Sequence, residues 1–289
     1  MAKKIQKGIH CKMKNKLKSS LILSSLLLNS ISTIVLADNQ EEEKQVPKEA
    51  SVEFVADELP TPPVDPTNPD PDPGIPVIPT DPTDPTNPPT EPPVGTDGPL
   101  SIDFVSTLYF GENKITGKTE NYSARAQGLF VGEDFKNVTN YAQVTDKRGT
   151  LEGWILSVKQ DTPFMTEASE NNKVHELVGA ELSFKNAYIS THSEDPEVST
   201  IKEKHIFVSG QEEEVLSTSK GHGGGTFTYN MGSPESLVVQ DGDNENLKDD
   251  EKVIINKDIN LNVPGKAVKK AEKYSTTLIW TLKNAVENR

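Results

Sequence analysis

Two short phrases constrain this chain more than any other feature: Gly153-Trp154-Ile155-Leu156 and Leu278-Ile279-Trp280-Thr281-Leu282. Each places a Trp two residues before a Leu inside an apolar run of β-prone residues, and the chain has only 2 Trp. Because residues i and i+2 of a strand share a face, Trp154 and Leu156 lie on one side of their strand, as do Trp280 and Leu282. The repeated arrangement predicts one domain closed by two related strands.

Further strand candidates follow one another along the second half of the chain, with turn residues between them. They cover residues 141–145, 151–159, 180–189, 205–209, 226–230, 252–263 and 274–283. Within 252–263, Ile259, Leu261 and Val263 alternate with two Asn, which indicates one dry and one wet face. No long stretch has a helical period. The pattern predicts an all-β fold, an antiparallel β-sandwich of Ig-like or barrel-like type.

The first 37 residues predict a secretory signal peptide. Seven Lys and no acidic residue precede an apolar run that begins at Leu21, and residues 35–37 (Val-Leu-Ala) form a small-residue cleavage signal. A retained membrane anchor is the alternative, which Asn29 and Ser30 disfavour. The single Cys, Cys11, precedes the apolar run, so we expect the exported chain to have neither disulfides nor thiol-based sites.

Charge narrows the classes of partner. Removing residues 1–37 changes the formal net charge from −14 to −21. A chain this acidic is a poor candidate for binding nucleic acid. Adhesion to an anionic surface would need local chemistry, because bulk charge opposes it.

Residues 38–98 predict a disordered spacer, acidic as far as Leu59 and Pro-rich beyond it. Of the 21 Pro, 16 lie between Pro60 and Pro99, many of them in Asp-Pro-Thr units. Proline fixes φ and lacks an N–H donor, so we expect an extended, solvated chain that takes no part in the core. The folded domain is then expected to span residues 99–289.

The residues around the two Trp resemble the WxL-domain surface proteins of Gram-positive bacteria. The similar segments, besides the two Trp-x-Leu phrases, are 98–105, Phe110-Gly111, Asp146-Lys147-Arg148-Gly149, 179–182, 259–265 and 274–282. Phe227 departs from the pattern, which usually has Trp after the Gly-rich stretch, and Ala285-Val286-Glu287 departs from the usual ending.

The resemblance implies a secreted protein associated non-covalently with the cell wall, with peptidoglycan as the ligand. It also implies assembly with a membrane-anchored WxL-interacting protein. We expect a non-enzymatic component of a surface complex. The chain shows neither an apolar tail nor a basic cluster before Arg289, so no signal for covalent sorting is expected. An adhesin for host matrix protein and a wall-glycan-cleaving enzyme are the alternatives.

The family-motif residues Trp154, Leu156, Trp280 and Leu282 allow two interpretations. Exposed indoles stack on sugars, whereas a Trp that shares its face with Leu normally points into a core, and the pattern favours the core. Lys266, Lys269, Lys270 and Lys273 form a basic cluster that would suit wall anions, although a solvated loop is the more common meaning of such a run.

Other motifs point to no cofactor, metal or catalytic residue. The glycine-rich stretch 221–225 lacks an accompanying Gly-x-Ser-x-Gly, so a flexible loop is favoured over an oxyanion hole. Residues 241–246 alternate oxygen donors as calcium loops do, but Asn246 and Lys252 stand where Gly and Glu are required. His175, His192 and His205 lack metal-ligand spacing.

Overall fold

The computed structural model describes residues 44–70, 74–84, 87, 89–168, 173–240 and 253–285. The chain divides into two units, residues 1–51 and residues 52–289, and the second is called the compact unit below. In the first unit the described residues, 44–51, are exposed and lack regular secondary structure. The predicted signal peptide and the calcium-type run at 241–246 lie outside the described residues. None of the described helices is long and apolar enough to span a membrane.

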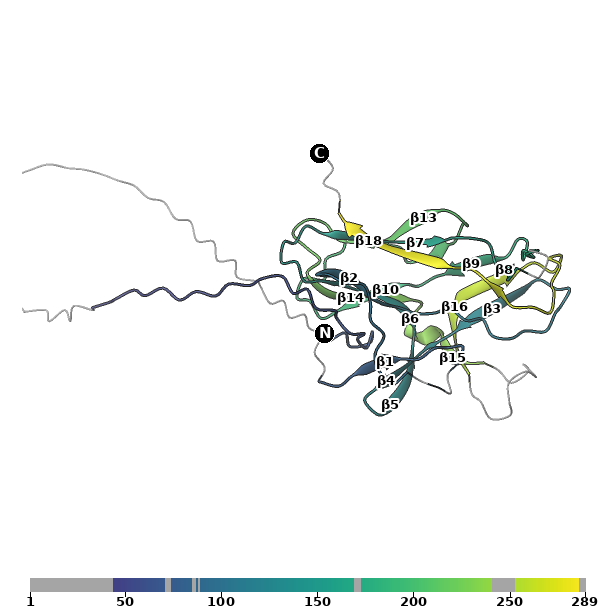
Figure 1. The fold of residues 1–289 in the computed structure, drawn as a ribbon, viewed down its shortest axis with the longest axis horizontal. Coiled ribbons are helices and arrows are strands. Elements are labelled where there is room, and N and C mark those ends of the chain that lie inside the picture. The colour runs from purple at the N-terminus through teal and green to yellow at the C-terminus, as the bar shows by residue number, and fades with distance from the viewer. Residues whose placement is uncertain are drawn as a thin grey trace, which may run out of the picture. The chain divides into compact units, whose positions relative to one another are not determined.

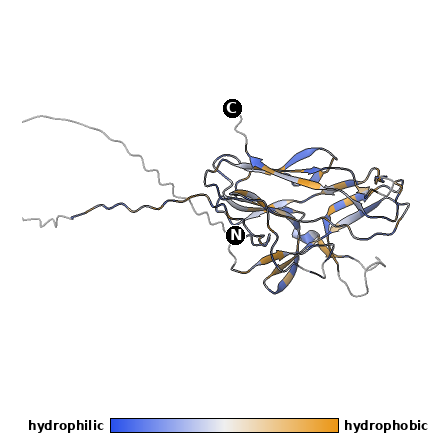
Figure 2. Cartoon of the chain, viewed as in Figure 1, coloured by the Kyte–Doolittle hydropathy of each residue, from blue (hydrophilic) through white to orange (hydrophobic). Residues whose placement is uncertain are grey.

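The compact unit is built from β-strands (Figure 1), and Figure 2 shows hydrophobic and hydrophilic residues interleaved along them. The strands are β1 (Val77–Pro79), β2 (Leu100–Val105), β3 (Glu120–Arg125), β4 (Gln127–Val131), β5 (Asp134–Val138), β6 (Asn140–Asp146), β7 (Trp154–Gln160), β8 (Met165–Thr166), β9 (Glu181–Phe184), β10 (Tyr188–Thr191), β11 (Thr200–Ile201), β12 (His205–Ile206), β13 (Glu212–Ser217), β14 (Gly225–Met231), β15 (Leu237–Val239), β16 (Ile254–Val263), β17 (Tyr274–Ser275) and β18 (Leu278–Asn284), with a 3₁₀ turn, η1, at Pro234–Ser236.

The predicted all-β, antiparallel fold is confirmed, but the division into sheets is finer than a simple two-sheet sandwich. Within the described residues the strands form five small sheets, ordered β1-β4-β5, β10-β14-β6-β2, β11-β13-β7-β18, β12-β9-β16-β15 and β17-β8, with β3 also paired to β16. Residues 180–189, predicted as one strand, form two. Asn186 between them has a φ of 54°, a left-handed conformation that breaks the extended run.

One main core joins three of these sheets. Strands β6, β14, β7, β9, β13 and β16 all contribute buried side chains to it. Its largest members include Trp154, Phe184, Phe227 and Tyr229, which are essentially inaccessible. Figure 1 shows the sheet of β13, β7 and β18 on one side of the unit, and β1, β4 and β5 on the opposite side. Strand β6 lies between these two sides and is buried along its whole length.

The second face of β6 is covered by Pro-rich chain, here called the strap (residues 61–70 and 74–82). Val64 is 1% exposed, and Val77 packs with Leu129, Val138 and Tyr141 in a second small core. Strand β1 of the strap pairs with β4. The expectation of a solvated spacer outside the core is therefore wrong for this stretch.

The physical reason is the unequal donor and acceptor content of a Pro-rich chain. Proline lacks an N–H but keeps its carbonyl, so such a chain has carbonyls that need donors from elsewhere. The domain supplies them: Tyr141 Oη donates to the Val64 carbonyl at 3.0 Å and Gln143 Nε2 to that of Pro62 at 2.9 Å. Gln127 Nε2 donates to the Thr80 carbonyl at 2.8 Å, and an Arg125 guanidinium nitrogen to that of Pro82 at 3.2 Å.

We expect Tyr141→Phe to lower the free energy of unfolding by about 1–2 kcal/mol, because the buried Val64 carbonyl loses its donor. Urea denaturation measures this loss, and limited proteolysis should cut the strap faster in the variant. Tyr122→Phe, at a half-buried tyrosine of β3, is the control. Equal cleavage rates in wild type and Tyr141→Phe would contradict the anchoring role of this hydroxyl.

Candidate functional site

The two Trp-x-Leu phrases lie on neighbouring strands of one sheet. Strands β7 and β18 pair antiparallel, with Leu156 opposite Leu282 and Val158 opposite Trp280. Residues directly opposite in such a ladder share a face, so both phrases contribute to one continuous apolar surface turned toward the main core. The structure thus brings together all four motif residues that the sequence singled out.

Trp154 is a core residue in this structure. Its side chain is 0% exposed, and its ring meets Phe227 edge-to-face with centroids 5.5 Å apart. The indole Nε1 donates to the Gly223 carbonyl at 2.9 Å, which satisfies the one polar atom of the ring. The Trp154 side chain is therefore inaccessible to a polymer at the surface.

Trp280 differs from Trp154 in being only half-buried. It packs against the main core from β18, the last strand in its sheet. Ile279, on the other face of β18, is exposed. Trp280 is consequently the motif indole with access to solvent.

The glycine-rich stretch 221–225 passes directly over Trp154. Gly223 has a φ of 90°, and a Cβ there would lie 2.3 Å from Thr218 Oγ1 and 2.8 Å from Trp154 Nε1. Only glycine fits this close approach. The indole hydrogen bond and the bond from the Gly221 N–H to the Leu151 carbonyl, 2.7 Å long, anchor the loop rather than leave it flexible.

Arg148 connects the two motif strands to β6. Its Nε and one terminal nitrogen bind the two Asp146 carboxylate oxygens at 2.9 and 2.7 Å, and the same terminal nitrogen donates to the Gly153 carbonyl at 3.0 Å. The other terminal nitrogen donates to Asn284 Oδ1 at 2.6 Å, at the end of β18. Hydrogen bonding to Asp146 raises the pKa of Arg148 above its usual value. The sequence marked this Asp-x-Arg as part of the family pattern but gave no role to the Arg.

The predicted basic cluster lies on the connection from β16 to β17, but its four amines are not equivalent. Lys269 Nζ donates to the Thr116, Pro264 and Ala267 carbonyls, each at 3.2 Å. Lys270 lies 3.6 Å from Glu272. Lys266 and Lys273 are exposed. Part of the cluster therefore stabilises its own loop.

A pocket of 610 Å³ lies between the Pro-rich chain and β2, lined by Asp81, Glu91, Asp103, Phe104 and Gln127 among others. Asp103 is almost fully buried and accepts hydrogen bonds from Ser101, Gln143 and Thr145. Burial raises its pKa above the usual range despite these three donors. This carboxyl belongs to the scaffold that seats the strap.

The described residues contain one cluster of metal-ligand type, formed by Asp195, Glu197 and His222. Asp195 and Glu197 lie on the connection from β10 to β11, and His222 lies in the glycine-rich stretch between β13 and β14. Sequence spacing did not reveal them, because the His is far along the chain from the two carboxylates.

The chain matches a known protein family over most of its length. A family model described as "WxL domain surface cell wall-binding" matches residues 41–285, a region that includes the strap as well as both Trp-x-Leu strands. No curated protein and no solved structure matches the chain.

Proposed function

We propose that this chain, which belongs to the WxL domain family, is a secreted protein that attaches non-covalently to peptidoglycan at the cell surface. The family match over residues 41–285 supports a surface cell wall-binding role and carries the proposal. Two parts of the proposal go beyond the family match: the choice of peptidoglycan as the ligand, and a non-enzymatic mode of action. In this proposal the protein acts by holding the wall polymer, and the rigid unit of paired sheets presents the binding surface.

The two indoles differ in burial, and we propose different roles for them. Trp154 holds the scaffold, because it is enclosed and its N–H is used internally. Trp280 is half-buried on an end strand, so we propose that its accessible part contacts the glycan by ring-to-sugar stacking. Such contact works in an acidic chain, since it does not depend on net charge.

The proposed contact for a partner protein is the outer edge of the same strand. Strand β18 lies at the end of its sheet, and one of its edges has no strand partner among the described residues. Exposed main-chain donors and acceptors of this kind accept an added strand. We propose this edge as the contact for the membrane-anchored WxL-interacting protein that the family resemblance implies.

Sedimentation of the purified chain with isolated walls tests the proposal. Three wall preparations are compared: untreated walls, walls stripped of teichoic acids, and walls stripped of proteins. We expect the chain to pellet with all three, because peptidoglycan is common to them. Failure to pellet with any preparation at any ionic strength would overturn wall binding, and a cleared band on a peptidoglycan zymogram would overturn the non-enzymatic part.

Substitutions on β18 test the assignment of Trp280. We expect Trp280→Ala to reduce retention on peptidoglycan more than Leu278→Ala, a half-buried neighbour on the same face. Melting temperatures measured in parallel separate lost contact from lost folding. Equal retention of the two variants at equal stability would remove Trp280 from the binding surface.

Removal of two positive charges tests whether the basic cluster takes part in wall binding. We expect Lys266→Gln/Lys273→Gln to retain wall binding with the same salt dependence as Lys204→Gln/Lys257→Gln, which removes two exposed charges elsewhere. A weaker salt dependence in the first variant alone would assign the loop a role in binding wall anions.

A further inference from the structure

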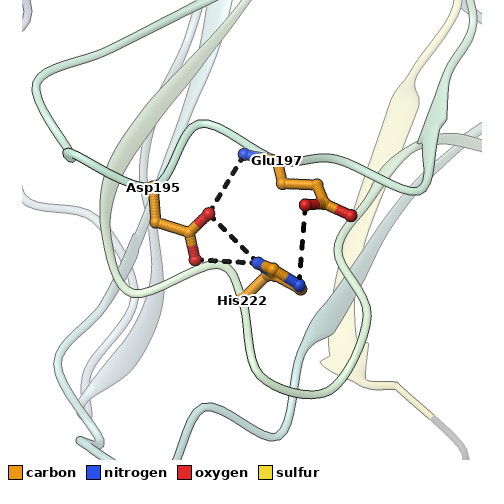
Figure 3. A group of neighbouring side chains, drawn as sticks. All are labelled: Asp195, Glu197 and His222. Carbon is orange, nitrogen blue, oxygen red and sulfur yellow. Dashed lines mark hydrogen bonds and ion pairs between the residues drawn. The ribbon is translucent and has the colours of Figure 1, made fainter. Parts of the chain in front are cut away.

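Three potential ligands converge from two loops (Figure 3). Asp195 and Glu197 lie on the connection from β10 to β11, and His222 lies on the glycine-rich connection from β13 to β14. His222 Nδ1 is 2.9 and 3.0 Å from the two Asp195 carboxylate oxygens. The other ring nitrogen, Nε2, faces Glu197 Oε2 at 3.7 Å. One ligand atom from each residue can be chosen so that all three lie within 4.8 Å of one another.

The two ring nitrogens of His222 have different environments. The contacts with Asp195 have hydrogen-bond length, which requires a proton on Nδ1, because a carboxylate only accepts. In a neutral imidazole Nε2 then carries a lone pair. That lone pair faces the carboxylate of Glu197, so two electron-rich atoms oppose each other and a cation between them would be stabilised.

The separation of Nε2 and Glu197 Oε2 bears on which cation fits. At 3.7 Å it is too long for an ordinary hydrogen bond. Two ligands of one tetrahedral zinc ion, each bonded at about 2.0–2.1 Å, lie roughly 3.4 Å apart. A small movement of the exposed Glu197 side chain would bring the pair to that spacing.

We propose that His222 Nε2 and the Glu197 carboxylate bind a divalent cation of the zinc class, and that Asp195 orients the imidazole through Nδ1. A carboxylate that accepts the second N–H of a metal-bound His fixes its tautomer and raises its basicity. Mixed nitrogen and oxygen ligands suit zinc better than magnesium. The His222 side chain is 30% exposed, so water can reach the ion and complete its coordination.

The loop that carries His222 is already held in place by the first motif. Gly223, the next residue, accepts the hydrogen bond of Trp154 Nε1, and the His222 N–H donates to the Ser219 carbonyl at 3.1 Å. On the other loop the Asp195 N–H donates to Ser193 Oγ at 3.3 Å. A bound ion would cross-link the two loops next to the buried Trp154. This role is independent of wall binding.

Calorimetric titration of the tag-free, chelator-treated chain with Zn²⁺ at neutral pH tests the site. We expect saturable uptake of one equivalent and a raised melting temperature, with no comparable effect of Mg²⁺. His222→Gln and Glu197→Gln should abolish uptake, and Asp195→Asn should weaken it about 10–100-fold. His192→Gln is the matched control, because His192 is exposed and lies on the same connection from β10 to β11 as Asp195 and Glu197. This variant should bind Zn²⁺ as wild type does.

Nitrogen NMR of the imidazoles distinguishes a metal ligand from an ion pair. We expect Zn²⁺ to shift Nε2 of His222 strongly and to leave Nδ1 protonated. Equal melting temperatures of the variants in chelator would show that they fold. The proposal is overturned if Zn²⁺ is not taken up, if His222→Gln binds it as wild type does, or if Nε2 is protonated and insensitive to Zn²⁺, which would make the cluster an imidazolium held by two carboxylates.

Discussion

Trp154→Ala is expected to lower the free energy of unfolding by about 3–5 kcal/mol, the range for removing a large aromatic side chain from a core. The cavity would lie against Phe227, whose ring meets the indole edge-to-face. The Gly223 carbonyl would also lose its donor. Urea denaturation followed by circular dichroism measures the change. Loss of wall binding in this variant should follow its loss of folded protein.

Two further variants sharpen the interpretation of Trp154. Trp154→Phe keeps a ring but not the N–H, so we expect an intermediate loss, and Trp280→Ala should cost less because Trp280 is only half-buried. If Trp154→Ala cost under about 1 kcal/mol and still abolished wall binding, the core assignment would be wrong.

Arg148→Met is the second large effect, with an expected loss of about 3–5 kcal/mol. The side chain of Asp146 is 1% exposed and that of Arg148 is 12% exposed, so removing the Arg leaves a buried carboxylate without its charged partner. The bonds to Gly153 and Asn284 are lost at the same time. Chemical denaturation measures the difference. Arg148→Lys should recover only part of it, because an ammonium cannot reproduce the two-pronged contact.

A double variant separates the buried charge from the lost packing. Asp146→Asn/Arg148→Met removes both charges, so we expect it to be more stable than Arg148→Met alone. A double variant no more stable than the single one would show that the hydrogen bonds to Gly153 and Asn284, and not the charge of Asp146, dominate the effect.

The strands that sequence patterns located best are those with one apolar face. Strands β6, β7, β14, β16 and β18 all overlap predicted runs, with ends that differ by a few residues. Strand β13 was missed because it begins with Glu212-Glu213-Glu214, which resembles a solvated acidic run. Its charges are accommodated at the surface, where Lys202 pairs with Glu213 at 2.9 Å and lowers the pKa of that carboxyl. Strands β3 to β5 carry mixed polar residues and show no clear alternation.

The strap could not be inferred from composition. A Pro-rich segment is expected to stay outside a fold because its prolines lack N–H donors. In this segment the carbonyls accept hydrogen bonds from side chains far away in the sequence, namely Gln127, Tyr141 and Gln143. Burial of these polar side chains in β4 and β6 becomes understandable only when the covering chain is known.

The candidate site was only partly accessible to sequence reasoning. The spacing of Trp and Leu predicted shared faces, which the structure has, and it left open whether each indole is inside or outside. The two indoles differ in burial because β7 has a neighbouring strand on both sides, β13 and β18, whereas β18 has a neighbouring strand on one side only among the described residues. The cluster at His222 depends on contact between two loops distant in sequence, which no local pattern encodes.

Direct opposition of Leu156 and Leu282 has a consequence for how the protein tolerates change. Insertions in the surface loops between the two strands leave this pairing intact, whereas a slip of one residue along β18 would turn Trp280 to the other face. Natural variation and engineered grafts should thus concentrate in the intervening loops. Leu156 and Leu282 are therefore expected to vary together. A smaller side chain at one of these positions should be compensated by a larger one at the other.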